Sequence, residues 1–356
     1  MTTPARTAEA EQASAAYHLA LTQLGAATIE DARKLWQAVP PVQTAALSAA
    51  WLRRAITLVM TRRARTRDLA MAYYRLVRAL RTGTTVADPR KPEPAYVTLA
   101  MLRREFAALA GTPASSTSPA PVATPEPVTP AAEPAESQAT QDRGDDEADR
   151  ILVEQIEAID AEQVRLERAA EQEARIDLEA LGPSNLDRKL ASIDTTAPAE
   201  QVDALREDAH RRAGTRQAAT AERLVMDGAR GQVWSLTQAD PRAQGYVRLS
   251  RSGTPCGWCA MLISRGPVYK SQRTAEYADG DAYHDNCHCY AEPVYSRDQY
   301  GDSALYALNR RYEQLWPQVT KGLRGKAALS AWRRFIRQEQ ATSARVAEST
   351  SSVQEA

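Results

Sequence analysis

The sequence predicts a mainly α-helical fold with a small α+β module toward its C-terminal third. The composition is rich in Ala, Arg and Glu but includes only two Phe, which favours helices with large exposed surfaces over a β-sandwich. Apolar residues recur at helical spacing along most of the chain. All four cysteines lie between residues 256 and 289, where short alternating segments replace the helical pattern. At 356 residues, the chain is long enough for two or three domains.

Residues 1–110 are predicted to form an N-terminal helical domain. Tyr17, Leu21 and Leu24 recur at helical spacing, and this first helix is expected to end near Gly25. Further helices are predicted at residues 29–39, 42–81 and 96–109. The aromatic residues at helical spacing in this domain are expected to be core residues: Trp36, Trp51, Tyr73 and Tyr74.

Residues 111–147 are predicted to be a disordered linker rich in Pro, Ala, Ser and Glu. They contain few aliphatic side chains, so they cannot bury enough apolar surface to offset an ordering entropy of roughly 1–2 kcal/mol per residue. Residues 148–232 are predicted to form a heavily charged helical rod. Its first helix should end at Gly182-Pro183, and a second is predicted at residues 199–232.

Residues 233–303 form the predicted α+β module. Residues 246–250 alternate like a short strand, and residues 290–295 have the pattern of a second strand directly after the last cysteine. Residues 304–356 are predicted to be C-terminal basic helices, the first starting at about residue 303 and the second covering residues 326–348.

The formal net charge of zero combines segments of opposite sign. Residues 1–110 carry 16 Lys and Arg against 8 Asp and Glu, residues 111–160 carry 2 against 11, and residues 304–348 carry 9 against 3. The basic helical ends suit an acidic or nucleic-acid partner. One run of arginines is a candidate for non-specific DNA contact, although most such runs are solvated helix faces: Arg53, Arg54, Arg62, Arg63, Arg65 and Arg67.

The cysteines are expected to be reduced. No segment has the roughly 18–20 consecutive apolar residues of a membrane span, and the first residues lack the apolar region of a secretory signal. We therefore expect a protein made in a reducing cytosol, where disulfides are rare. Four clustered cysteines in that setting favour a metal site over two disulfides.

The spacing of the cysteines is typical of a structural zinc site. Two intervening residues allow Cys256 and Cys259 to face one ion through a tight turn. Cys287 and Cys289 would point the same way on a strand, and His284 can join them from the preceding turn. These five residues are the predicted metal ligands, and they compete for about four positions around the ion. A closed site of this kind would hold the long connection between Cys259 and His284 by linking metal binding to folding.

Two alternative functions fit such a site less well. His284, Asn286 and His288 are the residue types that an HNH-like nuclease combines. Those enzymes, however, take the three residues from a strand, a loop and a helix. A hydrolytic zinc also needs an open coordination position and a general base, whereas this segment offers surplus ligands, so no catalytic residue is expected. A zinc-ribbon DNA-binding regulator would need a recognition helix beside the metal, and the intervening residues lack one rich in Arg or Lys.

A longer motif surrounds the predicted ligands. It consists of Cys256-Gly257-Trp258-Cys259-Ala260-Met261-Leu262-Ile263-Ser264-Arg265-Gly266-Pro267-Val268-Tyr269-Lys270-Ser271, then Tyr283-His284-Asp285-Asn286-Cys287-His288-Cys289 and Pro293-Val294. This motif resembles the minor head proteins of tailed phages related to the Mu F protein, in the form found in actinobacterial phages. The helical N-terminal domain is similar to that family only in its loose pattern.

The resemblance implies a MuF-like module, held together by a bound metal ion, within a low-copy phage minor capsid protein. Such a protein acts in head morphogenesis at the portal vertex and takes part in DNA delivery. The resemblance implies the portal protein and the major capsid or scaffold proteins as partners, without a small-molecule substrate. The expected location is the virion, in the capsid interior near the portal, and the host bacterial cytoplasm during assembly.

Overall fold

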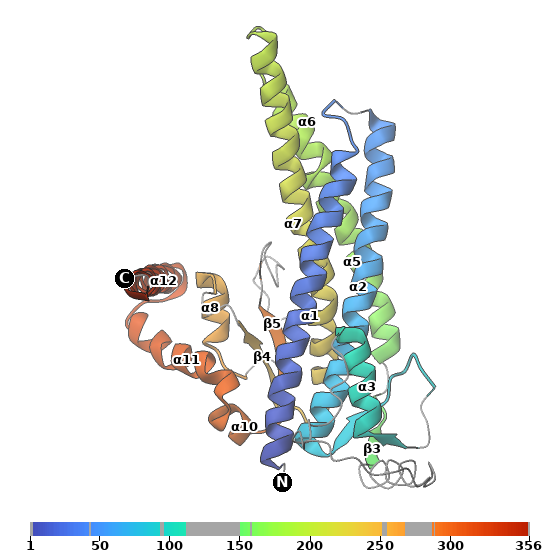
Figure 1. Ribbon diagram of the computed structural model, residues 1–356, viewed down its shortest axis with the longest axis vertical. Helices are drawn as coiled ribbons and strands as arrows, with labels where there is room; N and C mark the ends of the chain where they lie inside the picture. The colour runs from blue at the N-terminus through green and yellow to red at the C-terminus, as the bar shows by residue number, and fades with distance from the viewer. Residues whose placement is uncertain are drawn as a thin grey trace, which may run out of the picture. The chain divides into compact units, whose positions relative to one another are not determined.

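The computed structural model describes residues 3–42, 44–92, 96–111, 150–156, 159–250, 255–267, 287 and 289–354. These residues are mostly helical with a few short strands, which confirms the predicted fold class (Figure 1). The chain divides into two compact units, residues 1–20 with 71–157 and residues 21–70 with 158–356. The predicted linker lies outside the described residues except for residue 111, and the predicted domain boundaries stay a prediction. None of the described helices is both long and apolar enough to cross a membrane.

The first unit contains a small sheet that was not predicted. Its strands are β1 (Thr84–Val86), β3 (Arg150–Glu154) and β2 (Val97–Thr98), in the order β1-β3-β2. β1 is parallel to β3, and β2 is antiparallel to it. Assigning residues 150–154 to the helical rod is therefore wrong. Strands of two and three residues are too short to give an alternating pattern, and β3 is defined by its pairing with them.

Helices complete the first unit: the start of α1 (Pro4–Gln37), the end of α2 (Ala45–Thr82) and α3 (Leu99–Ala110). Arg78 of α2 is fully buried and donates to Thr84 Oγ1 at 2.6 Å and to Glu154 Oε2 at 2.5 Å, which joins α2 to the sheet. α3 begins later than predicted because Thr98 caps it, its Oγ1 accepting from Met101 N at 3.2 Å.

The second unit packs α5 (Ile159–Leu181), α6 (Pro183–Ala191) and α7 (Ala199–Ala239) with parts of α1 and α2 (Figure 1). α6 was not predicted as a helix. Pro183 does end α5, but it also stands in the first turn of α6, where its missing N–H removes no helical hydrogen bond. α7 continues past its predicted end at residue 232, because the following Val233 and Leu236 are buried in the fold.

The aromatic residues predicted for the core are buried. Trp36 and Trp51 are 2% and 3% exposed, and Tyr73 and Tyr74 are fully buried. In the second unit, the ring of Trp36 lies edge-on to that of Trp51 with centroids 4.9 Å apart, and its Nε1 donates to the carbonyl of His210 at 2.9 Å. Trp36 thus joins α1, α2 and α7 in one core, which confirms its predicted role.

Glycines in the second unit mark close approaches between helices. α1 continues through Gly25, so the predicted helix end at that residue is wrong. A Cβ on Gly25 would lie 3.1 Å from Oε1 of Glu222 on α7, and a Cβ on Gly214 of α7 would lie 2.4 Å from Cδ1 of Trp36. The missing side chain therefore admits a neighbouring helix, and the surrounding contacts offset the weak helix propensity of glycine.

The C-terminal part of the second unit contains both predicted strands, β4 (Gly245–Leu249) and β5 (Tyr290–Val294), which are paired antiparallel and buried. The elements around them are α8 (Gly257–Ile263), α10 (Arg297–Asp302), the 3-10 helix η1 (Ala304–Tyr306), α11 (Ala307–Val319) and α12 (Gly325–Gln354). The two C-terminal helices are thus confirmed, with small shifts of their ends.

Side chains of the C-terminal helices hold β4 and α8 in place. Asn309 of α11 donates to the carbonyl of Arg248 at 2.9 Å, and Gln340 of α12 donates to the carbonyl of Pro255 at 2.8 Å. Trp332 of α12 is fully buried between these helices. The start of α8, where the first cysteine pair lies, is therefore fixed by residues far along the chain.

Gly228→Ala should lower the free energy of unfolding of the second unit by about 1–3 kcal/mol, because its Cβ would lie 2.6 Å from Cγ and 2.9 Å from the carbonyl oxygen of Arg63. Gly231, one turn further along α7, has no such neighbour within 4 Å. Gly231→Ala should therefore raise the free energy of unfolding by about 0.5–1 kcal/mol. Denaturant titrations followed by circular dichroism measure both changes, and equal effects would contradict the close approach of α2 and α7.

Lowering the pH should destabilise the second unit through His210. Burial lowers the pKa of this histidine, whose ring stacks on Trp36 with centroids 5.2 Å apart. Because the unfolded chain binds the proton more readily, this stability is complete above the unfolded pKa of about 6.5 and is lost as the pH falls through the folded pKa. The melting temperature should decrease from pH 7.5 to 5.5, and His210→Phe should weaken this dependence. An unchanged pH profile in the variant would refute the assignment.

Candidate metal centre

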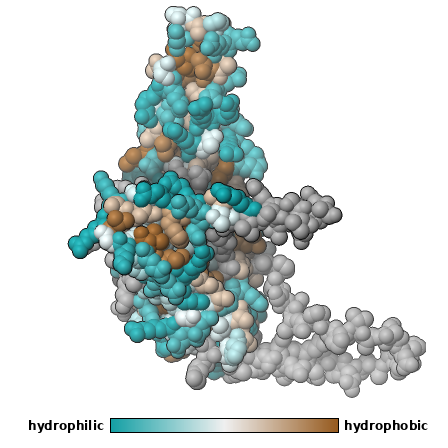
Figure 2. Space-filling model, turned by 90° about the vertical axis from the view of Figure 1, so that its left-hand side faces the viewer, coloured by the Kyte–Doolittle hydropathy of each residue, from teal (hydrophilic) through white to brown (hydrophobic). Residues whose placement is uncertain are grey.

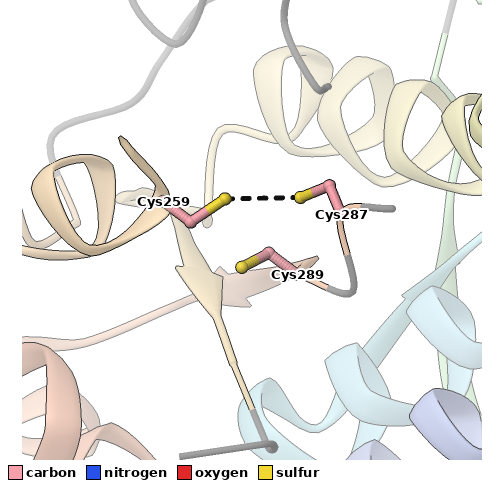
Figure 3. Close-up of side chains that lie close together, drawn as sticks. All are labelled: Cys259, Cys287 and Cys289. Atoms are coloured by element: carbon pink, nitrogen blue, oxygen red, sulfur yellow. Dashed lines mark hydrogen bonds between the residues drawn. The ribbon is translucent and has the colours of Figure 1, made fainter. Parts of the chain in front are cut away.

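Three of the five predicted ligands meet in the described structure. The Sγ atoms of Cys259, Cys287 and Cys289 lie within 4.8 Å of one another, and those of Cys259 and Cys287 are 3.3 Å apart (Figure 3). The three residues are only 2–3% exposed. We call them the cysteine cluster.

Local structure places these sulfur atoms. The C-x-x-C segment forms the start of α8, where Cys256 is the N-cap and its Sγ accepts a hydrogen bond from Cys259 N at 3.3 Å. Cys259 therefore lies in the first turn of α8. Cys287 and Cys289 directly precede β5, and the pairing of β5 with β4 carries them toward α8.

The other two predicted ligands stay predictions. Cys256 is exposed and does not belong to the group of three sulfurs, although it neighbours Cys259 on the same turn. His284 lies outside the described residues. All four cysteines are free thiols, and none forms a disulfide.

The geometry of the cysteine cluster fits a tetrahedral metal ion. Zinc–sulfur bonds of about 2.3 Å in a tetrahedron place the sulfur atoms about 3.8 Å apart. One observed separation is 3.3 Å and the others are at most 4.8 Å, a range that includes this value. Cys259, Cys287 and Cys289 could thus supply three ligands, with Cys256 or His284 as the predicted fourth.

The three thiols hold their protons unequally. Hydrogen bonds from Cys259 and Cys289, with the positive charge of Arg230, lower the pKa of Cys287 far below its usual range. Hydrogen bonds with Cys256 and Cys287 raise the pKa of Cys259. The cluster therefore favours one thiolate and keeps neighbouring thiols protonated. A divalent cation would replace those protons, since the thiolate is the form that binds metal.

Two buried arginines beside the cluster were not predicted. Arg230 of α7 donates to the carbonyls of Cys287 and Cys289, and Arg248 of β4 is close enough to act on the charge of Cys289. Both arginines precede the cysteine motif in the sequence and do not belong to it. A motif of metal ligands gives no signal for such residues, because only the tertiary fold brings them to the site.

Part of the chain matches a known protein family. Residues 167–315 match the family model described as VG15 protein, and the match indicates a phage-associated protein. The matched range extends from within α5 to within α11 and includes all four cysteines. No curated protein and no solved structure matches the chain.

The wild-type chain should bind about one zinc ion, and Cys259→Ser, Cys287→Ser and Cys289→Ser should each abolish stoichiometric binding. The loss arises because serine replaces a thiolate with a hydroxyl that does not ionise at neutral pH. Elemental analysis of each purified protein after dialysis measures the ratio. Comparing Cys256→Ser with His284→Ala identifies the fourth ligand, and a metal-free wild-type chain would contradict the assignment.

Proposed function

We propose that this chain is a low-copy phage minor capsid protein that acts in head morphogenesis at the portal vertex and in DNA delivery. The observation that carries the proposal is the match of residues 167–315 to the VG15 family model. The motif at residues 256–294, which resembles Mu F-like minor head proteins, lies inside the matched range. Both likenesses therefore concern the same part of the chain.

In this proposal the protein acts by binding and has no turnover, and its metal is structural. The three sulfur atoms are buried, and four protein ligands would complete the coordination shell of a zinc ion. A catalytic zinc needs one position for water or substrate. The metal would instead connect α8 to the segment before β5, in a region where both elements are short.

The surface of the C-terminal helices supports a role in assembly. Figure 2 faces the side of the molecule that carries α11 and α12, where hydrophilic residues surround a smaller hydrophobic patch. Leu323, between the two helices, is 41% exposed. The exposed basic residues of this region are Arg311, Lys321, Arg324, Lys326, Arg333, Arg334, Arg337 and Arg345. Such a surface suits an acidic partner, and the proposed partners are the portal protein and the major capsid or scaffold proteins.

Non-specific DNA contact would use a smaller surface than the arginine run of α2 suggests. Arg62 pairs with Asp31, and Arg63 and Arg67 pair with Glu167 on α5. These three arginines therefore stabilise the helix packing. The other three, Arg53, Arg54 and Arg65, are exposed, and they are the residues proposed to contact phosphates.

Mass spectrometry of purified heads tests this function. Peptides of the wild-type chain should occur in heads at an abundance far below that of the major capsid protein. Cys259→Ser should remove the chain from heads, because loss of the metal unfolds the cysteine-containing segment, while the first unit, residues 1–20 with 71–157, stays folded. The control Gly231→Ala should be incorporated normally. Absence of the wild-type chain from heads would refute the proposal, and cleavage of DNA or binding to promoter DNA would favour the alternatives.

A further inference from the structure

Arg230 of α7 is bonded to the backbone of the cysteine cluster. Its Nε donates to the carbonyl of Cys289 at 3.1 Å, and its Nη2 donates to the carbonyl of Cys287 at 2.5 Å. Its Nη1 donates to Oδ1 of Asp227, one turn earlier on α7, at 2.9 Å. The side chain is 3% exposed, so these bonds form away from water.

The two carbonyl bonds constrain the direction of two ligand side chains. A guanidinium is planar, and its donors point in fixed directions. One rigid group bonded to the carbonyls of both Cys287 and Cys289 therefore restrains the orientation of both peptide planes. This restraint limits the directions that the Cα–Cβ bonds of the two cysteines can take. The sulfur positions in Figure 3 thus depend on a side chain from a helix more than 50 residues earlier.

Arg230 also brings a positive charge to a site that would carry negative charge. Three or four thiolates around a divalent cation leave a net charge of about −1 to −2. A buried net charge is costly unless an opposite charge lies beside it. Two nitrogens of the Arg230 guanidinium bond to the carbonyls of Cys287 and Cys289, so its positive charge lies directly beside the ligand residues. That charge would offset the negative charge of the thiolates.

We propose that Arg230 is a positioning residue of the metal centre, which orients Cys287 and Cys289 before the ion binds and offsets the charge of the thiolates afterwards. This inference rests on the metal site proposed above but concerns a residue outside its motif. It is independent of the role in phage heads. A purely structural Arg230 would only tie α7 to β5, and its loss would lower stability without changing the metal-binding geometry.

Arg63 provides the matched control. Its side chain is 10% exposed, donates to the carbonyl of Leu224 at 2.8 Å and pairs with Glu167 at 2.9 Å. It therefore makes the same kinds of bond as Arg230, to a carbonyl of α7 and to a carboxylate, and no described bond joins it to a cysteine. Arg63→Met reports the effect of losing a buried arginine in the same unit.

The experiment compares four full-length proteins: wild type, Arg230→Lys, Arg230→Met and Arg63→Met. Metal affinity is measured by zinc competition with a chromophoric chelator, and geometry by the absorption spectrum of bound Co²⁺. Arg230→Met should weaken zinc binding by about 10–100-fold and alter the Co²⁺ spectrum. Arg230→Lys should restore part of the affinity through its charge, but the spectrum should stay altered because an ammonium lacks the planar donor pair. Arg63→Met should keep the wild-type affinity and spectrum.

A measurement on the metal-free proteins tests the same role without the ion. The thiols of Cys287 and Cys289 should react with a disulfide reagent faster in both Arg230 variants than in Arg63→Met, because their backbone is no longer held. Wild-type affinity and spectrum in Arg230→Met, or equal losses in Arg63→Met, would overturn the inference. If Arg230→Met does not fold, the inference is tested by Arg230→Lys alone. A wild-type Co²⁺ spectrum in that variant would overturn it. A wild-type chain that binds no metal overturns the metal site and this role together, whereas absence from phage heads affects only the proposed function.

Discussion

The C-terminal part of the second unit depends on the approach of three buried sulfur atoms. α8 and β5 are short. α8 packs against α11 and α12, whereas β5 pairs with β4 and packs against α7. The sulfur atoms of Cys259 and Cys287 join α8 to the residues before β5. Thiolates this close together repel one another. A cation bound between them would coordinate all of them, and metal binding would then stabilise the folded segment.

Helix α7 connects the cysteine cluster to the packing of the long helices. Gly214 and Gly228 allow α1 and α2 to approach α7 closely, and Arg230 lies on the same helix, bonded to the residues before β5. The helix packing and the site therefore share one element. A metal centre needs ligands that are held by rigid elements, and α7 gives the cysteine cluster that support.

The helical class and the candidate cysteine cluster could be read from residue patterns, because both arise from short-range spacing. Two residues between Cys256 and Cys259 place them at the N-cap and in the first turn of α8, and the pair at Cys287 and Cys289 precedes a buried strand. The three-stranded sheet and the continuity of α1 could not be read in this way. β3 is a strand through its pairing with β1 and β2. Gly25 lies within α1 at a position where Glu222 of α7 comes close enough to meet a Cβ.

The sequence by itself determined the helical periodicity, the two strands beside the cysteines and the chemical identity of the candidate ligands, since each depends on neighbours within a few residues. Only the tertiary structure decided which cysteines meet, which arginines of α2 are used in packing, and that Arg230 holds the ligand backbone. The physical reason is that these are contacts between segments tens of residues apart. Their energies depend on burial and charge in the folded chain, and no local pattern of residues records them.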